Sequence, residues 1–189
     1  MCISTQVYAD KITASTTSPD KGKPEHVYIM VNGNGNYVAA TTEPVVDDAE
    51  NGLFAFYAVN GVDGAYYIYS YTIKKWLTYD KKATYSDGKS FIKLSDTKVE
   101  GTYFKVNNYE GDNYEISPYD TSGNVAGQYL NYHGGYDLCI GLTLGIWTSG
   151  GADDANSRYV FSEFDIADRT YTITVPKGVI LKIDNQVYE

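Results

Sequence analysis

From Val27 to about residue 165, short apolar runs alternate with turn-forming residues. The runs consist of β-branched and aromatic side chains, and Gly, Asn and Asp separate them, as in the stretch 32–36. Runs of this kind are typical of strands. No stretch of ten or more residues has the apolar period of 3.6 that an amphipathic helix needs. The pattern therefore predicts an all-β domain.

One arrangement of four strands recurs three times within this region. The first unit has strands at Val27–Ile29, Tyr37–Val38, Pro44–Val46 and Phe54–Phe56. The second has them at Tyr66–Ile68, Trp76–Leu77, Phe91–Leu94 and Phe104–Val106. The third has them at Tyr114–Ile116, Tyr129–Leu130, Leu144–Thr148 and Tyr159–Phe161.

Three units of four strands predict one domain, because a single unit cannot bury its own apolar face. A β-trefoil fits this count, and a β-sandwich of short strands is the alternative. Under the threefold interpretation, Phe56, Val106 and Phe161 should occupy equivalent core positions.

The chain divides into three parts on this interpretation. Residues 1–25 are rich in Ser, Thr, Lys, Asp and Pro and are expected to form a loosely packed leader. Residues 26–165 form the β-trefoil domain. Residues 166–189 contain two apolar runs, 171–175 and 179–183, around Pro-Lys-Gly, which predict a β-hairpin extension or the start of a following domain.

Net charge and composition oppose several classes of binding partner. The net charge of −9 opposes binding to nucleic acid or to an anionic membrane surface. No apolar run reaches the ~18 residues that a membrane-spanning helix needs, and the N-terminus lacks the pattern of an export signal. We therefore expect a cytoplasmic chain or one whose signal has been removed; a lipid anchor would explain Cys2 directly after Met1.

Candidate catalytic and metal-binding groups are sparse. The only histidines, His26 and His133, lie in different units and do not form a metal-binding pair. Cys139 lies beside Leu138 and Ile140, as expected of a packed rather than a nucleophilic cysteine. The sequence therefore predicts no enzyme activity, no metal and no cofactor.

Three segments in the third unit carry a family resemblance. They are Gln128–Tyr136, Gly145–Thr148 and Ala152–Phe161. They resemble the ricin-type β-trefoil modules, in particular those appended to secreted polysaccharide-degrading enzymes of gut bacteria. In that family each repeat ends in Gln-x-Trp, where this chain has Ser157-Arg158-Tyr159. The resemblance implies a sugar-binding module of a secreted or cell-surface protein, with glycan and neighbouring domains as partners.

The third unit also has the richest mixture of groups for a sugar site. Aromatic rings supply flat apolar faces, and polar side chains supply hydrogen bonds. The candidates are Trp147, Tyr132 and Tyr136 as ring faces, with Asp153, Asp154, Asn156 and His133 as hydrogen-bonding groups. The alternative is that Trp147 is a core strand residue and the Asp-Asp-Ala-Asn run an ordinary polar turn.

The sequence thus predicts a non-catalytic, carbohydrate-binding accessory module of a secreted glycan-degrading protein. The alternative function is a structural or protein-interaction spacer of a multidomain surface protein. In that case the 20 tyrosines only build the core and the sheet faces.

Overall fold

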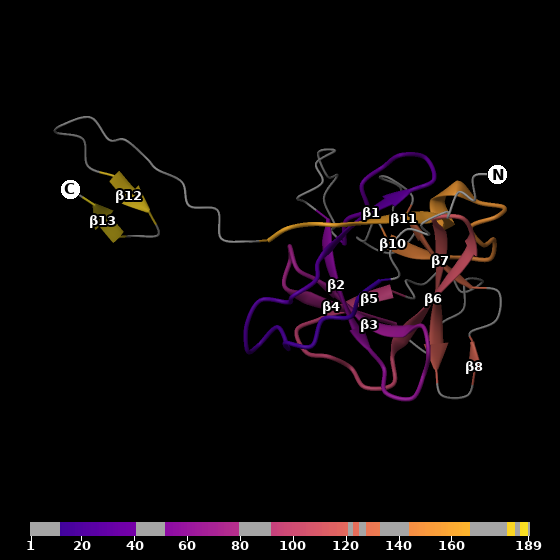
Figure 1. The fold of residues 1–189 in the computed structure, drawn as a ribbon, viewed down its shortest axis with the longest axis horizontal. Coiled ribbons are helices and arrows are strands. Elements are labelled where there is room, and N and C mark those ends of the chain that lie inside the picture. Colours follow the sequence, from indigo (N-terminus) through magenta and orange to yellow (C-terminus); the bar gives the residue numbers. More distant parts are fainter. Residues whose placement is uncertain are drawn as a thin grey trace, which may run out of the picture.

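The computed structural model describes residues 12–40, 52–79, 92–120, 123–124, 128–132, 144–166, 181–183 and 186–188. Strands dominate these ranges (Figure 1). The strands are β1 (Tyr28–Asn32), β2 (Leu53–Ala58), β3 (Ala65–Ser70), β4 (Lys75–Tyr79), β5 (Ile92–Ser95), β6 (Tyr103–Glu110), β7 (Asn113–Asp120), β8 (Gly123–Asn124), β9 (Tyr129–Tyr132), β10 (Leu144–Trp147), β11 (Tyr159–Glu163), β12 (Leu181–Ile183) and β13 (Gln186–Tyr188). A 3-10 helix, η3 (Ala155–Ser157), precedes β11. Within the described ranges, no helix has the length and apolar character needed to cross a membrane.

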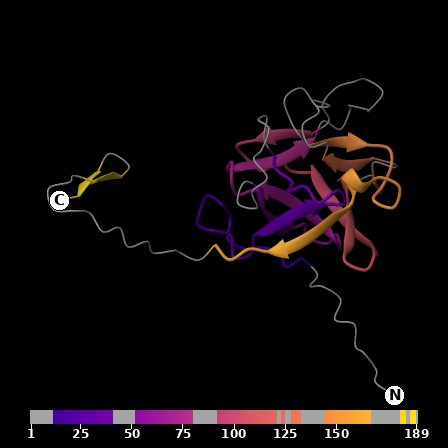
Figure 2. The ribbon, with the colours of Figure 1, turned by 90° about the horizontal axis from the view of Figure 1, so that it is seen from above.

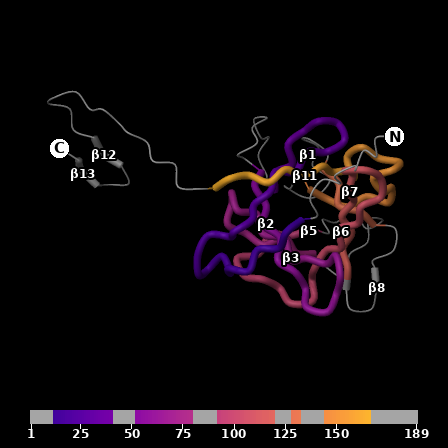
Figure 3. The backbone as a smooth tube through the Cα atoms, viewed as in Figure 1, coloured from indigo at the N-terminus to yellow at the C-terminus, as the bar shows by residue number. Residues whose placement is uncertain are grey.

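Six antiparallel strands close into a barrel. Around the ring, β1 pairs with β2, β2 with β3, β3 with β6, β6 with β7, β7 with β11, and β11 with β1. The pairing of β11 with β1 joins the last barrel strand to the first over five residue pairs (Figures 2 and 3). The ring therefore has no free edge, so it does not present the row of unpaired backbone N–H and C=O groups that an open sheet has at its edge.

The strand registers repeat around the ring. One set of pairs is Tyr28↔Phe54, Tyr66↔Phe104 and Tyr114↔Tyr159. A second set is Phe56↔Ile68, Val106↔Ile116 and Phe161↔Met30. In the first set each pair lies within one predicted unit, and in the second set each pair joins one predicted unit to the next. The threefold repeat, with superposition of the units under a ~120° rotation, stays a prediction.

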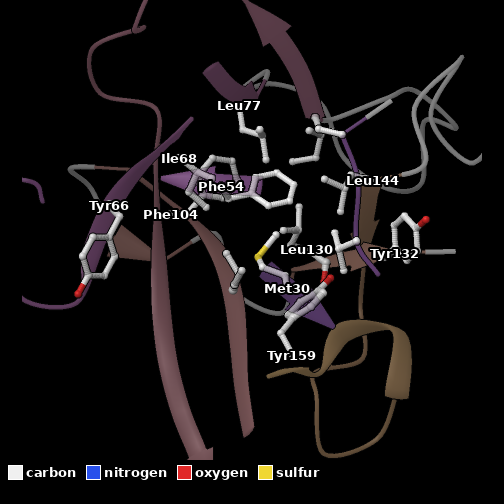
Figure 4. Close-up of a cluster of buried hydrophobic side chains, with 14 of the residues drawn as sticks. Met30, Phe54, Tyr66, Ile68, Leu77, Phe104, Leu130, Tyr132, Leu144 and Tyr159 are labelled. Carbon is white, nitrogen blue, oxygen red and sulfur yellow. The ribbon is translucent and has the colours of Figure 1, made fainter. Parts of the chain in front are cut away.

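The barrel interior is filled by inward side chains from all six strands. Phe54, Phe104 and Tyr159 are fully buried. Phe56 is also fully buried, whereas Val106 and Phe161 are partly buried and pack against the same core. Figure 4 shows side chains from several strands converging on this core. Small barrels of this kind are filled by layers of side chains and contain no channel.

Hairpins add further side chains to the same core. In the second unit β4 pairs with β5, and in the third β9 pairs with β10. In the first unit an isolated bridge joins Val31 to Tyr37, and the predicted strand 44–46 lies outside the described residues. The inward residues Val38, Leu77 and Leu130 are buried and belong to the barrel core.

The outer face of the barrel has its own apolar cluster. It contains Tyr67, Tyr69, Trp76 and Tyr103 at the outward positions of their strands. Residues 12–25 of the predicted leader pack on the barrel: Ile12 joins the core, and the Ser15 N–H donates to the Phe56 carbonyl at 2.8 Å. This segment is therefore part of the folded domain.

The C-terminal part contains one separate two-stranded sheet. Its strands β12 and β13 pair antiparallel, with Lys182 opposite Val187. The run 171–175, which the sequence predicts as the hairpin partner of 179–183, lies outside the described residues.

The barrel core predicts a large stability difference between two substitutions. Phe104→Ala removes a fully buried ring and should lower the free energy of unfolding by about 3–5 kcal/mol. Val160→Ala changes a side chain that is 40% exposed and should cost less than about 1 kcal/mol. Urea unfolding followed by circular dichroism measures both. A loss below about 1 kcal/mol for Phe104→Ala would contradict the core assignment.

Candidate functional site

The predicted third-unit site is built on the β9–β10 hairpin and the loop that leads to η3. Strand pairing places Trp147 opposite Tyr129 and Leu144 opposite Tyr132. The loop then turns back through two glycines: the N–H groups of Asp153 and Asp154 both donate to the Gly150 carbonyl, at 3.1 and 2.9 Å. The loop thereby carries Asp153, Asp154 and Asn156 away from the end of β10.

Tyr132 belongs to the core, which corrects the prediction that its ring is a stacking face. It is 5% exposed and belongs to the barrel cluster, beside Leu144 (Figure 4). The reason is strand alternation: Leu130 and Tyr132 point inward from β9, as Leu77 and Tyr79 do from β4. A ring packed among the side chains of the barrel core offers no face to a ligand.

Asp154 organises the loop internally. One carboxylate oxygen, Oδ1, accepts from the N–H of Asn156 at 2.8 Å, which caps η3. The other oxygen accepts from Asn131 Nδ2 at 3.0 Å, and the same amide nitrogen donates to Ser157 Oγ at 2.8 Å. Both carboxylate oxygens therefore already have protein donors.

Asn156 connects the third unit to the first. Its Oδ1 accepts from Asn32 Nδ2 at 3.1 Å and from Asn34 Nδ2 at 2.7 Å. An amide oxygen has two lone pairs, so these donors saturate it. Asn32 in turn accepts from the N–H groups of Asn34 and Asn36, which shapes the turn after β1. Asn156 is thus mainly a bridge between loops.

Asp153 and Trp147 are the predicted residues that stay accessible. Asp153 is exposed, and its carboxylate has no hydrogen-bond partner among the described residues. Trp147 is half-buried at the end of β10. His133 and Tyr136, the other predicted site residues, lie outside the described residues, as does Cys139. The structure brings Asp154, Asn156 and Asn131 into one network, with Asp153 at its margin.

Burial keeps the neighbouring phenol neutral. Tyr159 is fully buried below this loop and donates to the Leu130 carbonyl at 2.9 Å. Loss of solvent, reinforced by the negative charge of Asp154, raises the pKa of Tyr159 well above its ordinary value.

In the part of the chain that the structure describes, no group of three or more His, Cys, Asp or Glu side chains is placed to hold a metal ion.

A second candidate site, absent from the sequence interpretation, lies on the outer face of the barrel. It is a cavity of about 740 Å³ lined by Tyr57, Tyr67, Tyr69 and Trp76 together with residues 14–20 and 96–98. The signal in the sequence was the run Tyr66-Tyr67-Ile68-Tyr69, in which Tyr67 and Tyr69 face one side of the strand and Tyr66 and Ile68 face the other. The local sequence pattern does not predict that segment 14–20 lies against these outward rings.

The barrel with its hairpins is shared with solved structures. No family model matches the chain, and no curated protein does. The structure of BEL, described as a β-trefoil, aligns with 74% of this chain and 94% of its own, at a TM-score of 0.50 and 12% identity. The fold is a β-trefoil.

Two other similar structures belong to much longer chains. A mosquitocidal holotoxin aligns with 74% of this chain at a TM-score of 0.53 and 14% identity, over 17% of its own length. A GH43 β-1,3-galactosidase aligns with 78% of this chain at a TM-score of 0.50 and 15% identity, over 29% of its own length. At these identities the similarity establishes the fold of this chain alone.

The Asn131–Asp154 contact predicts a pH-dependent loss of stability. Asn131 is fully buried, so Asn131→Asp places a second carboxylate against Asp154. Repulsion and burial raise the folded-state carboxyl pKa above its unfolded value, so the penalty is full at pH 7 and shrinks as pH falls toward 4. We expect a loss of about 2–4 kcal/mol at pH 7 in urea unfolding.

The matched control is the double variant Asn131→Asp with Asp154→Asn, which exchanges amide and carboxylate. It should recover most of the stability, because only one charge is then present. An equal loss for the single and the double variant at pH 7 would contradict this account of the network.

Proposed function

We propose that this chain is a non-catalytic carbohydrate-binding module. The observation that carries the proposal is local: on a β-trefoil, the loop following the half-buried Trp147 presents an exposed Asp153 carboxylate without a partner among the described residues. An aromatic ring and a carboxylate acceptor are the kinds of group that contact a sugar ring and its hydroxyl groups. His133 and Tyr136 are the further contacts that the sequence predicts for this site.

The proposed role is that of an accessory domain of a larger secreted or cell-surface glycan-degrading protein. Support comes from the similar folds of the holotoxin and the galactosidase, in which the aligned region is a minor part of a longer chain. Weak contacts suffice for such a role, because tethering raises the effective concentration of an attached catalytic domain near its glycan.

We further propose that the chain itself breaks no bond. In the third-unit loop, both oxygens of Asp154 accept hydrogen bonds from Asn131 and Asn156. Asp153 therefore carries the one carboxylate in this loop that has no hydrogen-bond partner among the described residues. Glycoside hydrolysis ordinarily uses two carboxyl groups about 5–9 Å apart.

The threefold organisation is part of the proposal. Each unit pairs an inward aromatic at the start of its fourth strand with a tyrosine of its first strand, as in Tyr66↔Phe104. The proposal is that the units arose as repeats of one four-stranded motif. The run Asp-Asp-Ala-Asn precedes the last strand of the third unit, and the similar run Asp-Asp-Ala-Glu-Asn, residues 47–51, precedes that of the first. We propose the glycan site in the third unit, where Trp147 precedes the loop.

A spacer domain is the second candidate, and one observation favours it. Tyr132, Asp154 and Asn156 were predicted as ligand contacts, and all three are engaged in packing or internal hydrogen bonds. If the remaining third-unit residues contact no glycan either, the domain serves to hold its neighbours at a fixed distance.

The third-unit site predicts a loss of glycan binding with little loss of stability. Wild-type protein should bind a glycan with a dissociation constant of about 0.1–1 mM, and Trp147→Ala should weaken binding about tenfold or more. Asp153→Asn should weaken it about three- to tenfold, through loss of one charged acceptor. Calorimetric titration at high glycan concentration measures both.

Glu110→Gln is the matched control, because it removes one exposed carboxylate at another surface position. Its affinity should equal that of the wild type. Thermal melting separates the roles of Trp147: unfolding by Trp147→Ala, together with unchanged binding by Asp153→Asn, would count against the third-unit site and favour the spacer.

A further inference from the structure

The cavity on the outer face of the barrel has the construction of a binding site. We call the aromatic rings from β2, β3 and β4 that line it the base, and the lining residues of segments 14–20 and 96–98 the rim. The rings are fixed by mutual contact: the centroid of Trp76 lies 5.1 Å from that of Tyr57 and 5.0 Å from that of Tyr69. A rigid apolar base of this kind needs little rearrangement on binding.

The rim is anchored to the domain by a dense set of hydrogen bonds. The Glu25 carboxylate accepts from the N–H groups of Thr16 and Thr17 at 2.9 and 3.0 Å, and from both hydroxyl groups. These bonds hold the pKa of Glu25 well below its ordinary value. Tyr57 Oη donates to the Thr17 carbonyl at 3.1 Å, which fastens the rim to the base.

Two polar groups of the base lack partners. Tyr69 is 6% exposed and Trp76 is 8% exposed, yet neither the Tyr69 hydroxyl nor the Trp76 indole N–H has a hydrogen-bond partner among the described residues. Neither atom is among the described side-chain atoms that are both sealed from solvent and unpaired. Buried phenol and indole groups ordinarily find partners. These two groups are therefore open to a ligand in the cavity that they line.

The hydroxyl groups of the other two tyrosines of the base do have hydrogen-bond partners. Tyr57 Oη is bonded to Thr17, and Tyr67 Oη donates to Glu100 at 2.6 Å. Tyr57 and Tyr67 thus have hydrogen-bond partners whereas Tyr69 and Trp76 do not, although all four residues line the same cavity. The unpaired groups mark the part of the base where a ligand would gain hydrogen bonds.

The charged side chains around the cavity already have partners within the protein. Asp96 pairs with Lys75, Lys98 pairs with Glu100 at 2.8 Å, and Asp20 accepts from the Ser18 hydroxyl. A charged ligand would have to displace one of these partners. A neutral ligand with an apolar face and several hydroxyl groups can use the rings and the two free polar groups without that cost.

We propose that this cavity binds a neutral saccharide of one or two rings, hydrogen-bonded to the Tyr69 hydroxyl and the Trp76 N–H and in apolar contact with the parts of these side chains that line the cavity. The volume of about 740 Å³ is in the range of small-ligand sites. The inference rests on the proposed carbohydrate function, and it adds a second site, whose lining includes neither Trp147 nor Asp153.

The chain has two tryptophans, and each belongs to one of the two sites. The test uses ¹⁵N-labelled full chain, in which the two indole N–H signals are assigned by Trp76→Phe and Trp147→Phe. The probes are the methyl glycosides of glucose, galactose, mannose and N-acetylglucosamine, each titrated to about 100 mM, well above the ~1 mM that a weak site requires. We expect the Trp76 signal to shift in a saturable manner with at least one probe.

Tyr69→Phe supplies the matched variant, because it removes only the unpaired hydroxyl and keeps the ring. It should weaken saccharide binding at the Trp76 signal about three- to tenfold while leaving the melting temperature close to that of the wild type. Tyr66→Phe makes the same change on the opposite, inward face of the same strand and should leave binding unchanged.

The outcomes separate the two proposals. If the Trp147 signal alone shifts, or if Tyr69→Phe binds as tightly as the wild type, the cavity is not a saccharide site and the third-unit site stands by itself. If neither indole signal shifts with any probe, both the cavity site and the proposed function fail for these sugars. A saturable Trp76 shift that Tyr69→Phe weakens supports the cavity site.

Discussion

The closed ring of six antiparallel strands is the constraint on which the rest of this structure depends. Pairing of β11 with β1 brings residues near 160 against residues near 30, and every other barrel pairing lies between them. Closure satisfies the backbone groups that an open sheet would leave at its edges. It also surrounds a core of aromatic side chains, so the pairing and the core stabilise each other. Both candidate sites are built outside this ring, on segments that it positions.

The two candidate sites differ in how far the fold has already used their polar groups. In the third-unit loop, the Asn131–Asp154–Asn156 network consumes most of the hydrogen-bonding capacity that the sequence offered to a ligand. In the outer cavity, the rim is tied down by Glu25 while the Tyr69 and Trp76 polar groups are left open. Polar groups engaged by the protein give shape to a loop, and polar groups left open in a cavity give it binding capacity.

The sequence predicted the strands better than the site, for physical reasons. Strand alternation and turn residues are local, so the segments around Tyr66–Ile68 and Phe104–Val106 were found as β3 and β6. The side of a strand that a residue faces depends on register, which local pattern leaves open; for this reason Tyr132 was interpreted as a ligand face although it lies in the core. The cover that segment 14–20 forms over the outward tyrosines depends on contacts distant in sequence, such as Ser15 with Phe56, which no local pattern indicates.

A glycan array probed with the purified chain in tetravalent form tests whether this β-trefoil is a carbohydrate-binding module. Multivalent display converts individually weak contacts into measurable retention. We expect retention on at least one class of neutral glycan, and competition of that retention by the free sugar. Absence of retention on every neutral glycan, with the protein shown to be folded by its melting transition, would contradict the proposed function.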